Sequence, residues 1–174
     1  MNFAHLLLGK DRRSVARMNE VVRSVQDQET FDELFGLLLH HERLLVIRAA
    51  DAIEKIVSKK REFLFPHKDQ LLTLFRGAVH QSLKWHLALL VPRLELDPDQ
   101  VKEVWGILSY WAQNPNERKI VRVNSLQGLF DLSHRYSGYS DAFGHTLQAL
   151  EHERIPSLQA RIKKLRKVVP LREY

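Results

Sequence analysis

The sequence predicts an all-α protein, a right-handed α-α superhelix of stacked helix pairs, on three observations. Apolar residues recur at the helical spacing i, i+3, i+4 and i+7 through most of the chain. Strand signals are poor, because there is no Asn-Gly or Asp-Gly dipeptide and only 7 glycines occur. Polar or proline-containing stretches interrupt the apolar pattern and leave helices of about ten to sixteen residues, an ordinary length for a compact all-α protein.

The expected elements follow one another along the chain. Thr30-Phe31-Asp32-Glu33 has the pattern of a capping box and predicts a helix that begins there. Asp97-Pro98-Asp99 predicts an N-cap, a first helical residue and an acid matched to the helix dipole. Pro92 should kink or end its helix, because it lacks a backbone N–H. The predicted organisation is a single domain, 1–174, with a helix at about 14–26, repeats at about 30–60, 67–96 and 98–135, and a capping pair at about 141–168.

The segment that begins at Leu45 repeats twice, each time after 38 residues, so that Leu45, Leu83 and Val121 align. The further aligned sets are Ala49, Leu87 and Ser125; Ala50, Ala88 and Leu126; Ile53, Val91 and Leu129; and Ile56, Leu94 and Leu132. Because 38 residues are about ten and a half helical turns, helical periodicity alone does not produce this match. We therefore expect successive copies of one helix pair.

Small side chains occupy the most apolar part of the second helix of each copy. They are Ala49, Ala50, Ala52, Ala88, Ser125 and Gly128. Small side chains let two helix axes approach to the short end of the usual range of about 8–10 Å. We therefore expect these positions at close helix–helix contacts, in pairs that bury their apolar faces by stacking.

The second helix of a HEAT repeat has the pattern Val-Arg-x-x-Ala-Ala-x-Ala-Leu-Gly-x-Ile, and this chain resembles it in LVIRAADAIEKI, Leu45–Ile56. The stretch departs from the pattern at the arginine position, Val46, and at the glycine position, Glu54. The later copies place Lys84 and Arg122 at the arginine position. The resemblance covers about 30–135. It implies membership of the HEAT/armadillo-like helical-repeat family, whose members mostly bind proteins and in some cases nucleic acid.

The resemblance also implies that the second helices line a concave surface. The side chains expected there form three rows across the copies, with Leu89 in the second row. The candidate partner-binding residues of this surface, called the ladder below, are Arg48, His86 and Asn124; Asp51 and Gln127; and Lys55, Arg93 and Asp131. Repeat stacks commonly bind on this surface, which favours a protein partner. The alternative is an ordinary solvated face.

Four of five large side chains have two interpretations each, and the fifth, Trp105, has one. Lys84 and Arg122 could contact a ligand, but we favour structural cations that join neighbouring repeats through partly desolvated hydrogen bonds. Trp105 fits the apolar stripe of its helix and is predicted to lie in the core. Tyr110 and Trp111 could form a stacking platform, but we favour packing against the next repeat.

The sequence offers little for catalysis. There is no glycine-rich phosphate loop, nucleophile elbow or zinc-deaminase pattern. Among the 9 histidines, the adjacent His40 and His41 diverge on a helix, and His145 and His152 have no nearby set of carboxylates, so no metal site is predicted. We expect a protein that is not an enzyme and needs no cofactor.

Charge is concentrated at one end of the chain. The formal net charge is +6, but His152 to Tyr174 carries +5 of it, so the remaining 151 residues carry only +1. The candidate basic patch of this end is Arg161, Lys163, Lys164, Arg166 and Lys167. These residues could solvate a capping helix, or they could hold nucleic acid or an acidic partner.

The alternative to protein binding is a nucleic-acid-binding stack. Tyr110 and Trp111, with a carboxylate from Asp51 or Asp131, would resemble an alkylpurine DNA glycosylase, which holds a damaged base beside a carboxylate on a basic concave surface. The nearly neutral body weighs against this alternative, because duplex binding needs several cations that face the phosphates.

Composition predicts a cytoplasmic protein without membrane contact. Hydrophobic residues make up 44% of the chain, enough for a core, and the absence of cysteine excludes disulfides and thiolate chemistry. The apolar run before Gly9 is too short for the core of a signal peptide. No stretch approaches the roughly eighteen apolar residues of a membrane span.

Overall fold

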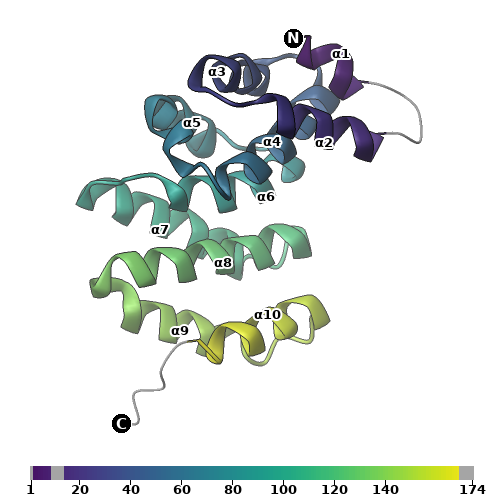
Figure 1. Ribbon diagram of the computed structural model, residues 1–174. Helices are drawn as coiled ribbons and strands as arrows, with labels where there is room; N and C mark the ends of the chain where they lie inside the picture. The colour runs from purple at the N-terminus through teal and green to yellow at the C-terminus, as the bar shows by residue number, and fades with distance from the viewer. Residues whose placement is uncertain (1, 9–13, 169–174) are drawn as a thin grey trace. The chain divides into compact units, whose positions relative to one another are not determined.

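The computed structural model describes residues 2–8 and 14–168 (Figure 1). All regular structure in these ranges is helical, which confirms the predicted all-α class. Within the same ranges, no helix is both long enough and apolar enough to cross a membrane. The chain divides into two compact units, Met1–Leu71 and Leu72–Tyr174, and their membership of one domain stays a prediction.

The described part of the first unit contains a short N-terminal helix that the sequence did not predict. The bounds are α1 Phe3–Leu8, α2 Ser14–Ser24, α3 Gln28–Gly36, η1 Leu37–Leu39, α4 Arg43–Val57 and η2 Arg61–His67. The prediction placed the first helix at about 14–26, which is α2. The six residues of α1 are too few to give a periodic signal, and the helix is stabilised by packing of Phe3 and Leu7 where α1 meets α2 and α4.

The cap of α3 corrects a second prediction. The helix begins at Gln28 rather than after Thr30, because Asp27 is its N-cap. The Thr30 backbone N–H donates to Asp27 Oδ1 at 2.9 Å, and the Thr30 hydroxyl donates to the same oxygen at 2.7 Å. Thr30 is therefore the third helical residue of a capping box, not its start. An aspartate caps a helix as well as a threonine does, and the two candidates are only three positions apart.

The small residues of α4 lie inside the first unit, as predicted. Ala49, Ala50 and Ala52 have no exposed surface, and neither do Leu45 and Ile53. Within this unit α4 contacts α1, α2 and α3. The apolar stripe of Leu45–Ile56 is thus the central helix face of the unit, where small side chains let its neighbours come close.

The second unit begins within α5, Lys68–Arg76, and contains the last three predicted pairs of helices in shortened form. The remaining bounds are α6 Gln81–Leu90, η3 Val91–Arg93, α7 Pro98–Gln113, α8 Lys119–Arg135, η4 Ser137–Tyr139, α9 Ser140–Leu150 and α10 Pro156–Arg166. Asp97 caps α7 as predicted, because the Gln100 backbone N–H donates to its Oδ1 at 2.9 Å. Pro92 also acts as predicted, since α6 stops at Leu90 and the chain continues as a 3-10 turn.

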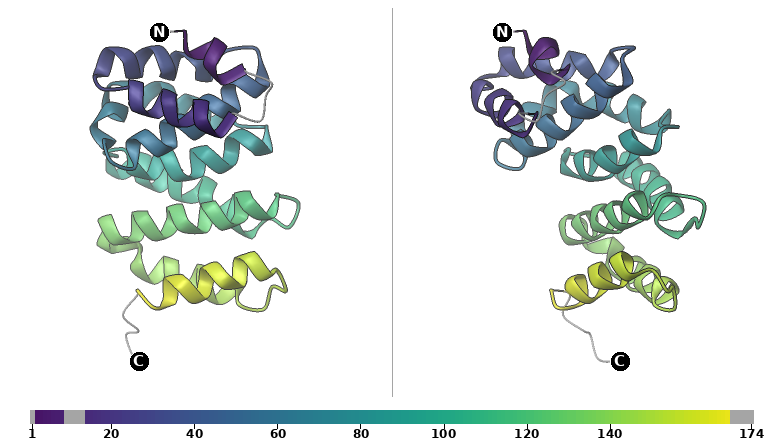
Figure 2. Two further views of the ribbon diagram at one scale, coloured as in Figure 1. Left: turned by 45° about the vertical axis from the view of Figure 1, so that its right-hand side comes forward. Right: turned by 90° about the vertical axis from the view of Figure 1, so that its right-hand side faces the viewer.

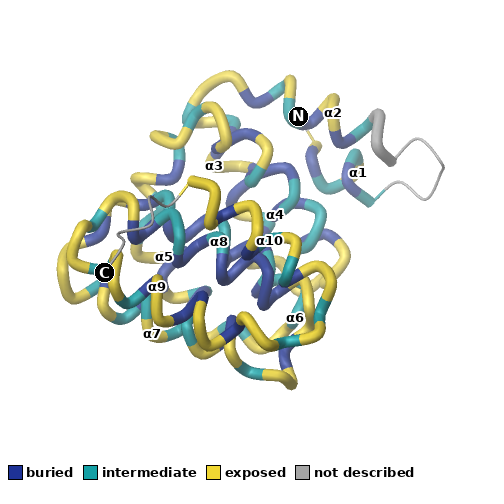
Figure 3. Tube along the Cα trace, turned by 90° about the horizontal axis from the view of Figure 1, so that it is seen from below, coloured by how far each residue is buried: buried dark blue, intermediate teal, exposed yellow. Residues whose placement is uncertain are grey.

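Helix α8 is the centre of the second unit. It contacts α6 and α7, and also α9 and α10, and the views in Figure 2 show it beside α10. Its residues 121–126 are all buried, so this part of the helix is covered on every side. Figure 3 shows the buried, dark blue stretch of the trace at the α8 label. A Cβ at Gly128 would lie 2.4 Å from the Ala88 carbonyl oxygen. This contact confirms the prediction that Ala88 and Gly128 lie where α6 and α8 approach closely.

Candidate functional site

The ladder residues of the first unit form two separate features. Arg48 is half-buried and donates to the Leu7 carbonyl oxygen, so it joins α4 to α1. Lys55 Nζ lies 2.7 Å from Asp51 Oδ2, one helical turn away, and both side chains are largely solvated. An exposed pair of this kind contributes less than about 1 kcal/mol to stability. Asp51 and Lys55 are therefore available at the surface as predicted, whereas Arg48 has a structural contact.

The first ladder row of the second unit is buried, which corrects its assignment to a binding surface. His86 and Asn124 are at most 9% exposed. Asn124 Nδ2 donates to the Trp85 carbonyl oxygen at 3.0 Å, and the His86 ring lies edge-on to the Trp85 ring, with centroids 5.1 Å apart. The close approach of α6 and α8 turns this row into the interface between them. These two residues cannot present their side chains to a partner.

The other ladder residues of the second unit come together with one residue of the predicted basic patch. Gln127 Nε2 donates to Asp131 Oδ1 at 2.8 Å, one turn along α8. Arg161 of α10 donates through Nη1 to Gln127 Oε1 at 2.6 Å. Arg93 of η3 exerts its positive charge on the same carboxylate. All four side chains are half-buried. We call Arg93, Gln127, Asp131 and Arg161 the α8 polar cluster.

Burial changes the electrostatics of one ladder residue, Asp131. Burial raises the pKa of Asp131, and this effect outweighs the Gln127 hydrogen bond and the positive charges of Arg93, His134 and Arg161, which lower it. The cluster therefore holds a carboxyl group that is costly to ionise at its site. Perturbed groups of this kind occur both at functional sites and in structural networks.

Lys84 has the structural role that we favoured. Its Nζ donates to the Glu117 carboxylate in the connection between α7 and α8, and both side chains are buried. The ammonium also lies 5.2 Å from the centroid of the Trp111 ring. A buried cation with a carboxylate and an aromatic face around it joins α6 to the next helix pair and is not free to contact a ligand.

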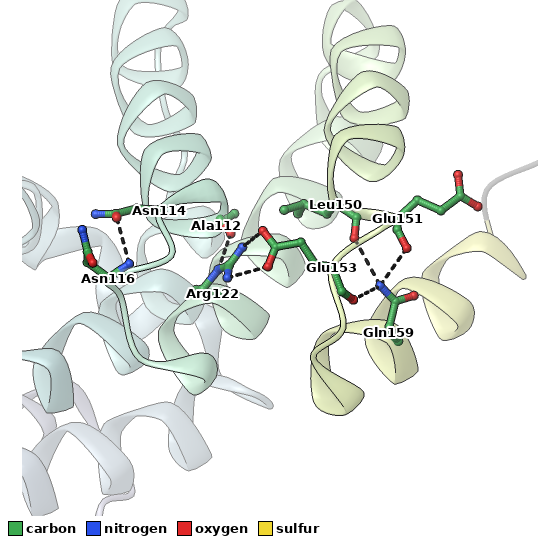
Figure 4. A network of polar contacts seen from close by, with 8 residues as sticks. All are labelled: Ala112, Asn114, Asn116, Arg122, Leu150, Glu151, Glu153 and Gln159. Carbon is green, nitrogen blue, oxygen red and sulfur yellow. Dashed lines mark hydrogen bonds and ion pairs between the residues drawn. The ribbon is translucent and has the colours of Figure 1, made fainter.

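Arg122 is the better-defined of the two cations (Figure 4). Only 2% of its surface is exposed. Its Nε donates to the Ala112 carbonyl oxygen at 2.9 Å, its Nη1 donates to Glu153 Oε2 at 2.8 Å, and its Nη2 donates to Glu153 Oε1. The hydrogen bonds from Arg122 hold the pKa of Glu153 below its usual value. This fork confirms the prediction of a structural cation and fastens the connection before α10 to α7 and α8.

Sequence reasoning missed the two residues that complete this network. Glu153 supplies the carboxylate, and the Gln159 side-chain amide donates to the carbonyl oxygens of Leu150, Glu151 and Glu153 at 3.2, 3.0 and 2.7 Å. Figure 4 shows Gln159 pointing into the turn that Arg122 holds from the other side. The signal available in the sequence was the buried cation itself, which requires a carboxylate somewhere in the following connection.

The aromatic residues of α7 lie in three different environments. Trp111 is buried and packs edge-on against Phe75, with ring centroids 4.9 Å apart, so it contacts the preceding predicted repeat rather than the next one. Trp105 is half-buried against Tyr139, at 4.7 Å, rather than in the core. Tyr110 is 64% exposed, so its predicted packing against the next repeat is wrong. Adjacent helical residues point about 100° apart, and Trp111 takes the inward direction.

The basic patch divides along α10. Arg161 belongs to the α8 polar cluster, and Arg166 Nη1 pairs with Glu151 Oε1 at 2.8 Å. Lys163, Lys164 and Lys167 are exposed and have no charged or hydrogen-bonding partner among the described residues. The helical spacing of Ile162, Leu165 and Val169 predicts that these three side chains face the rest of the protein. Ile162 and Leu165 are buried, as this spacing predicts, and Val169 lies outside the described residues.

No known protein family, no curated protein and no solved structure matches this chain. Within residues 2–8 and 14–168, no group of three or more histidine or acidic side chains is placed to hold a metal ion. What the site can do must therefore be inferred from the α8 polar cluster and from the exposed cations of α10.

Proposed function

We propose that this chain is a HEAT/armadillo-like helical-repeat module that binds a protein partner through exposed side chains of its second helices, those of α8 above all, and that it is not a catalyst. The repeat of 38 residues and the HEAT-like pattern of Leu45–Ile56 support the family. The two buried cations at the arginine position support it as well, because they join successive helix pairs.

The observation that carries the proposal is the α8 polar cluster. Gln127 bridges Asp131 and Arg161, so the three side chains hold one another in place before any partner arrives. All of them are only half-buried and can still be reached from solvent. A polar group that is ordered in advance loses less side-chain entropy on binding than a free one does, so this arrangement suits recognition.

The charges of the cluster indicate the chemistry of the partner. Arg93 and Arg161 can meet an acceptor, and Asp131 can accept from a donor, within one small area. A protein surface presents groups of both signs and can match this pattern. A phosphate backbone presents one sign only and would meet Asp131 unfavourably whenever that carboxyl is ionised.

Site-specific photocrosslinking in cells that produce the chain tests the proposal. A photoreactive amino acid is introduced at Leu89 or Gln127 on the expected binding face, and at the exposed Lys102 of α7 or Gln148 of α9 as matched controls. We expect a discrete protein adduct from the first two positions and not from the controls. Equal adducts from all four positions, or none from Leu89 and Gln127, would contradict the proposed face.

One observation favours a second candidate, nucleic-acid binding of the alkylpurine glycosylase kind. Arg93, His134 and Arg161 surround Asp131, so a carboxyl with a raised pKa lies among three groups that are or can become cationic. Damaged bases would be held beside such a carboxyl. The aromatic part of that site is not assembled from the predicted residues, because Trp111 packs on Phe75 and Tyr110 points into solvent.

A further inference from the structure

A separate hollow of about 280 Å³ lies along the outer side of α10. Its lining comes from α10 and from the end of α9, and so belongs to the second unit alone. The lining residues are Glu151, Gln159, Ile162, Lys163, Arg166 and Lys167. We call this hollow the α10 groove. It does not include the α8 polar cluster, so a ligand in the groove is independent of the proposed function.

The rim of the α10 groove has an excess of positive charge that nothing described in the chain neutralises. Arg166 pairs with Glu151 at 2.8 Å, and the hydrogen bond from Arg166 holds the pKa of Glu151 below its usual value, so the single carboxylate of the rim is already satisfied. Lys163 and Lys167 stand one turn apart on the same side of α10 and have no partner among the described residues.

The floor of the groove is apolar and fixed. Ile162 is 3% exposed and packs with the other inward residues of α10, Leu158 and Leu165. Gln159 cannot swing into the groove easily, because its amide donates to three carbonyl oxygens of the preceding turn. The hydrocarbon stems of Lys163 and Lys167 extend the apolar surface below their charged heads.

From the fixed apolar floor and the cationic rim, we propose that the α10 groove binds an acidic peptide segment in which glutamate or aspartate alternates with an apolar residue. The carboxylates meet the ammonium groups of Lys163 and Lys167, and the apolar side chain lies between their hydrocarbon stems, above the buried Ile162. A nucleic acid fits less well. The 11 residues of α10 span only about 16 Å, which leaves few phosphates within reach, and a phosphate backbone leaves the apolar floor without a partner.

The test uses the full chain and a fluorescein-labelled peptide, Glu-Leu-Glu-Leu-Glu-Leu-Glu-Leu, with fluorescence anisotropy as the readout. Lys163→Glu and Lys167→Glu are the groove variants. Lys164→Glu is the matched control, because Lys164 is equally exposed on the same helix but does not line the groove. We expect each groove variant to weaken binding about tenfold, since attraction becomes repulsion, and the control to weaken it by no more than about twofold.

Four results would overturn the proposal. Equal weakening by Lys164→Glu would show that only net charge is measured. Equal affinity for the same peptide with glutamine in place of glutamate would show that the ligand does not need carboxylates. Absence of saturable binding of the labelled peptide would show that the groove is not a peptide-binding site. Displacement of the peptide by duplex DNA at physiological salt, sensitive to Lys163 and Lys167, would assign the groove to nucleic acid instead. The α8 polar cluster is unchanged in these variants. None of the four results therefore bears on the proposed function, which the photocrosslinking experiment tests separately.

Discussion

Helices α4 and α8 align in the 38-residue repeat that the sequence predicts, yet their surroundings differ. Helix α4 has Val46 at the position where α8 has Arg122, and its buried face is entirely apolar, with three alanines among larger aliphatic side chains. Helix α8 buries residues 121–126 without interruption and fastens its neighbours with a hydrogen-bonded cation. The same register can therefore hold helices together by close apolar contact or by buried polar contacts.

The comparison extends to the partners of the cations. Lys84 has Glu117 as its partner, and the position 38 residues before Glu117 is Val79. In the first copy the cation position is also a valine, Val46. Both members of the pair are thus absent together from the first copy. A buried cation without its carboxylate would destabilise the fold, because its charge would be neither solvated nor paired. This is a physical reason for the cation and its carboxylate to be absent together.

The largest expected effect comes from removal of the α8 cation. Arg122→Ala should lower the free energy of unfolding by about 3 kcal/mol, because it leaves the Ala112 carbonyl oxygen without its donor and opens a cavity among buried side chains. Glu153→Gln should cost less, about 2 kcal/mol, because the buried guanidinium loses its balancing charge but the amide oxygen can still accept one hydrogen bond. Urea denaturation measures both, and equal costs for the two variants would contradict the structural role assigned to Arg122.

A smaller effect should come from the contact between α6 and α8. Gly128→Ala should cost about 2 kcal/mol, because the new Cβ would lie 2.4 Å from the Ala88 carbonyl oxygen, which is backbone and cannot turn aside. Gly106→Ala in α7 is the matched control. Nothing lies within 4 Å of that Cβ, so the better helix propensity of alanine should stabilise the protein by up to about 1 kcal/mol. Opposite signs in thermal or urea melts are expected, and a neutral Gly128→Ala would show that the two helices are not in close contact.

Local patterns predicted most of the helices but not their tertiary contacts. The cap at Asp97 and the stop at Pro92 depend on a few neighbouring residues, and both were predictable. The short α1 and the cap at Asp27 were missed, since one has too few residues for a period and the other competes with an equally good pattern nearby.

The candidate site was predicted in part for the same reason. Asp131, Gln127 and Arg93 were found from their register, because register determines which side of a helix a residue occupies. Burial of His86 and Asn124 and the pairing of Arg122 with Glu153 depend on how closely particular helices approach. No spacing within one helix contains that information.

The next effect is a pH dependence that differs in sign between two carboxyl groups. Burial raises the pKa of Asp131 above its usual value of 3.8, so its contribution to stability is fully present below pH 3.8 and is lost as the pH rises through the raised pKa. Asp131→Asn should therefore be more stable than the wild type at neutral pH, and this advantage should shrink as the pH falls. Glu153→Gln should behave in the opposite way, because the pKa of Glu153 is lowered and its contribution is lost on acidification. Thermal denaturation of both variants at neutral and mildly acidic pH measures these changes in stability. A loss of stability in Asp131→Asn at neutral pH would contradict the burial effect.

The last prediction is that the protein has no glycosylase activity. Its test asks whether Asp51 of α4 or Asp131 of α8 is a catalytic carboxyl group. Asp51 of α4 pairs with Lys55 at the surface, Asp131 of α8 accepts from Gln127, and Trp111 of α7 packs on Phe75. A glycosylase needs a carboxylate beside a stacked base on a surface that holds phosphates. We expect purified protein to release no 7-methylguanine or 3-methyladenine from methylated DNA above the rate in buffer, measured by chromatography of the freed bases. Release that is lost in Asp131→Asn and kept in Asp51→Asn would place a catalytic site at the α8 polar cluster. It would replace protein binding with DNA repair as the function, and the raised pKa of Asp131 would then be part of the chemistry.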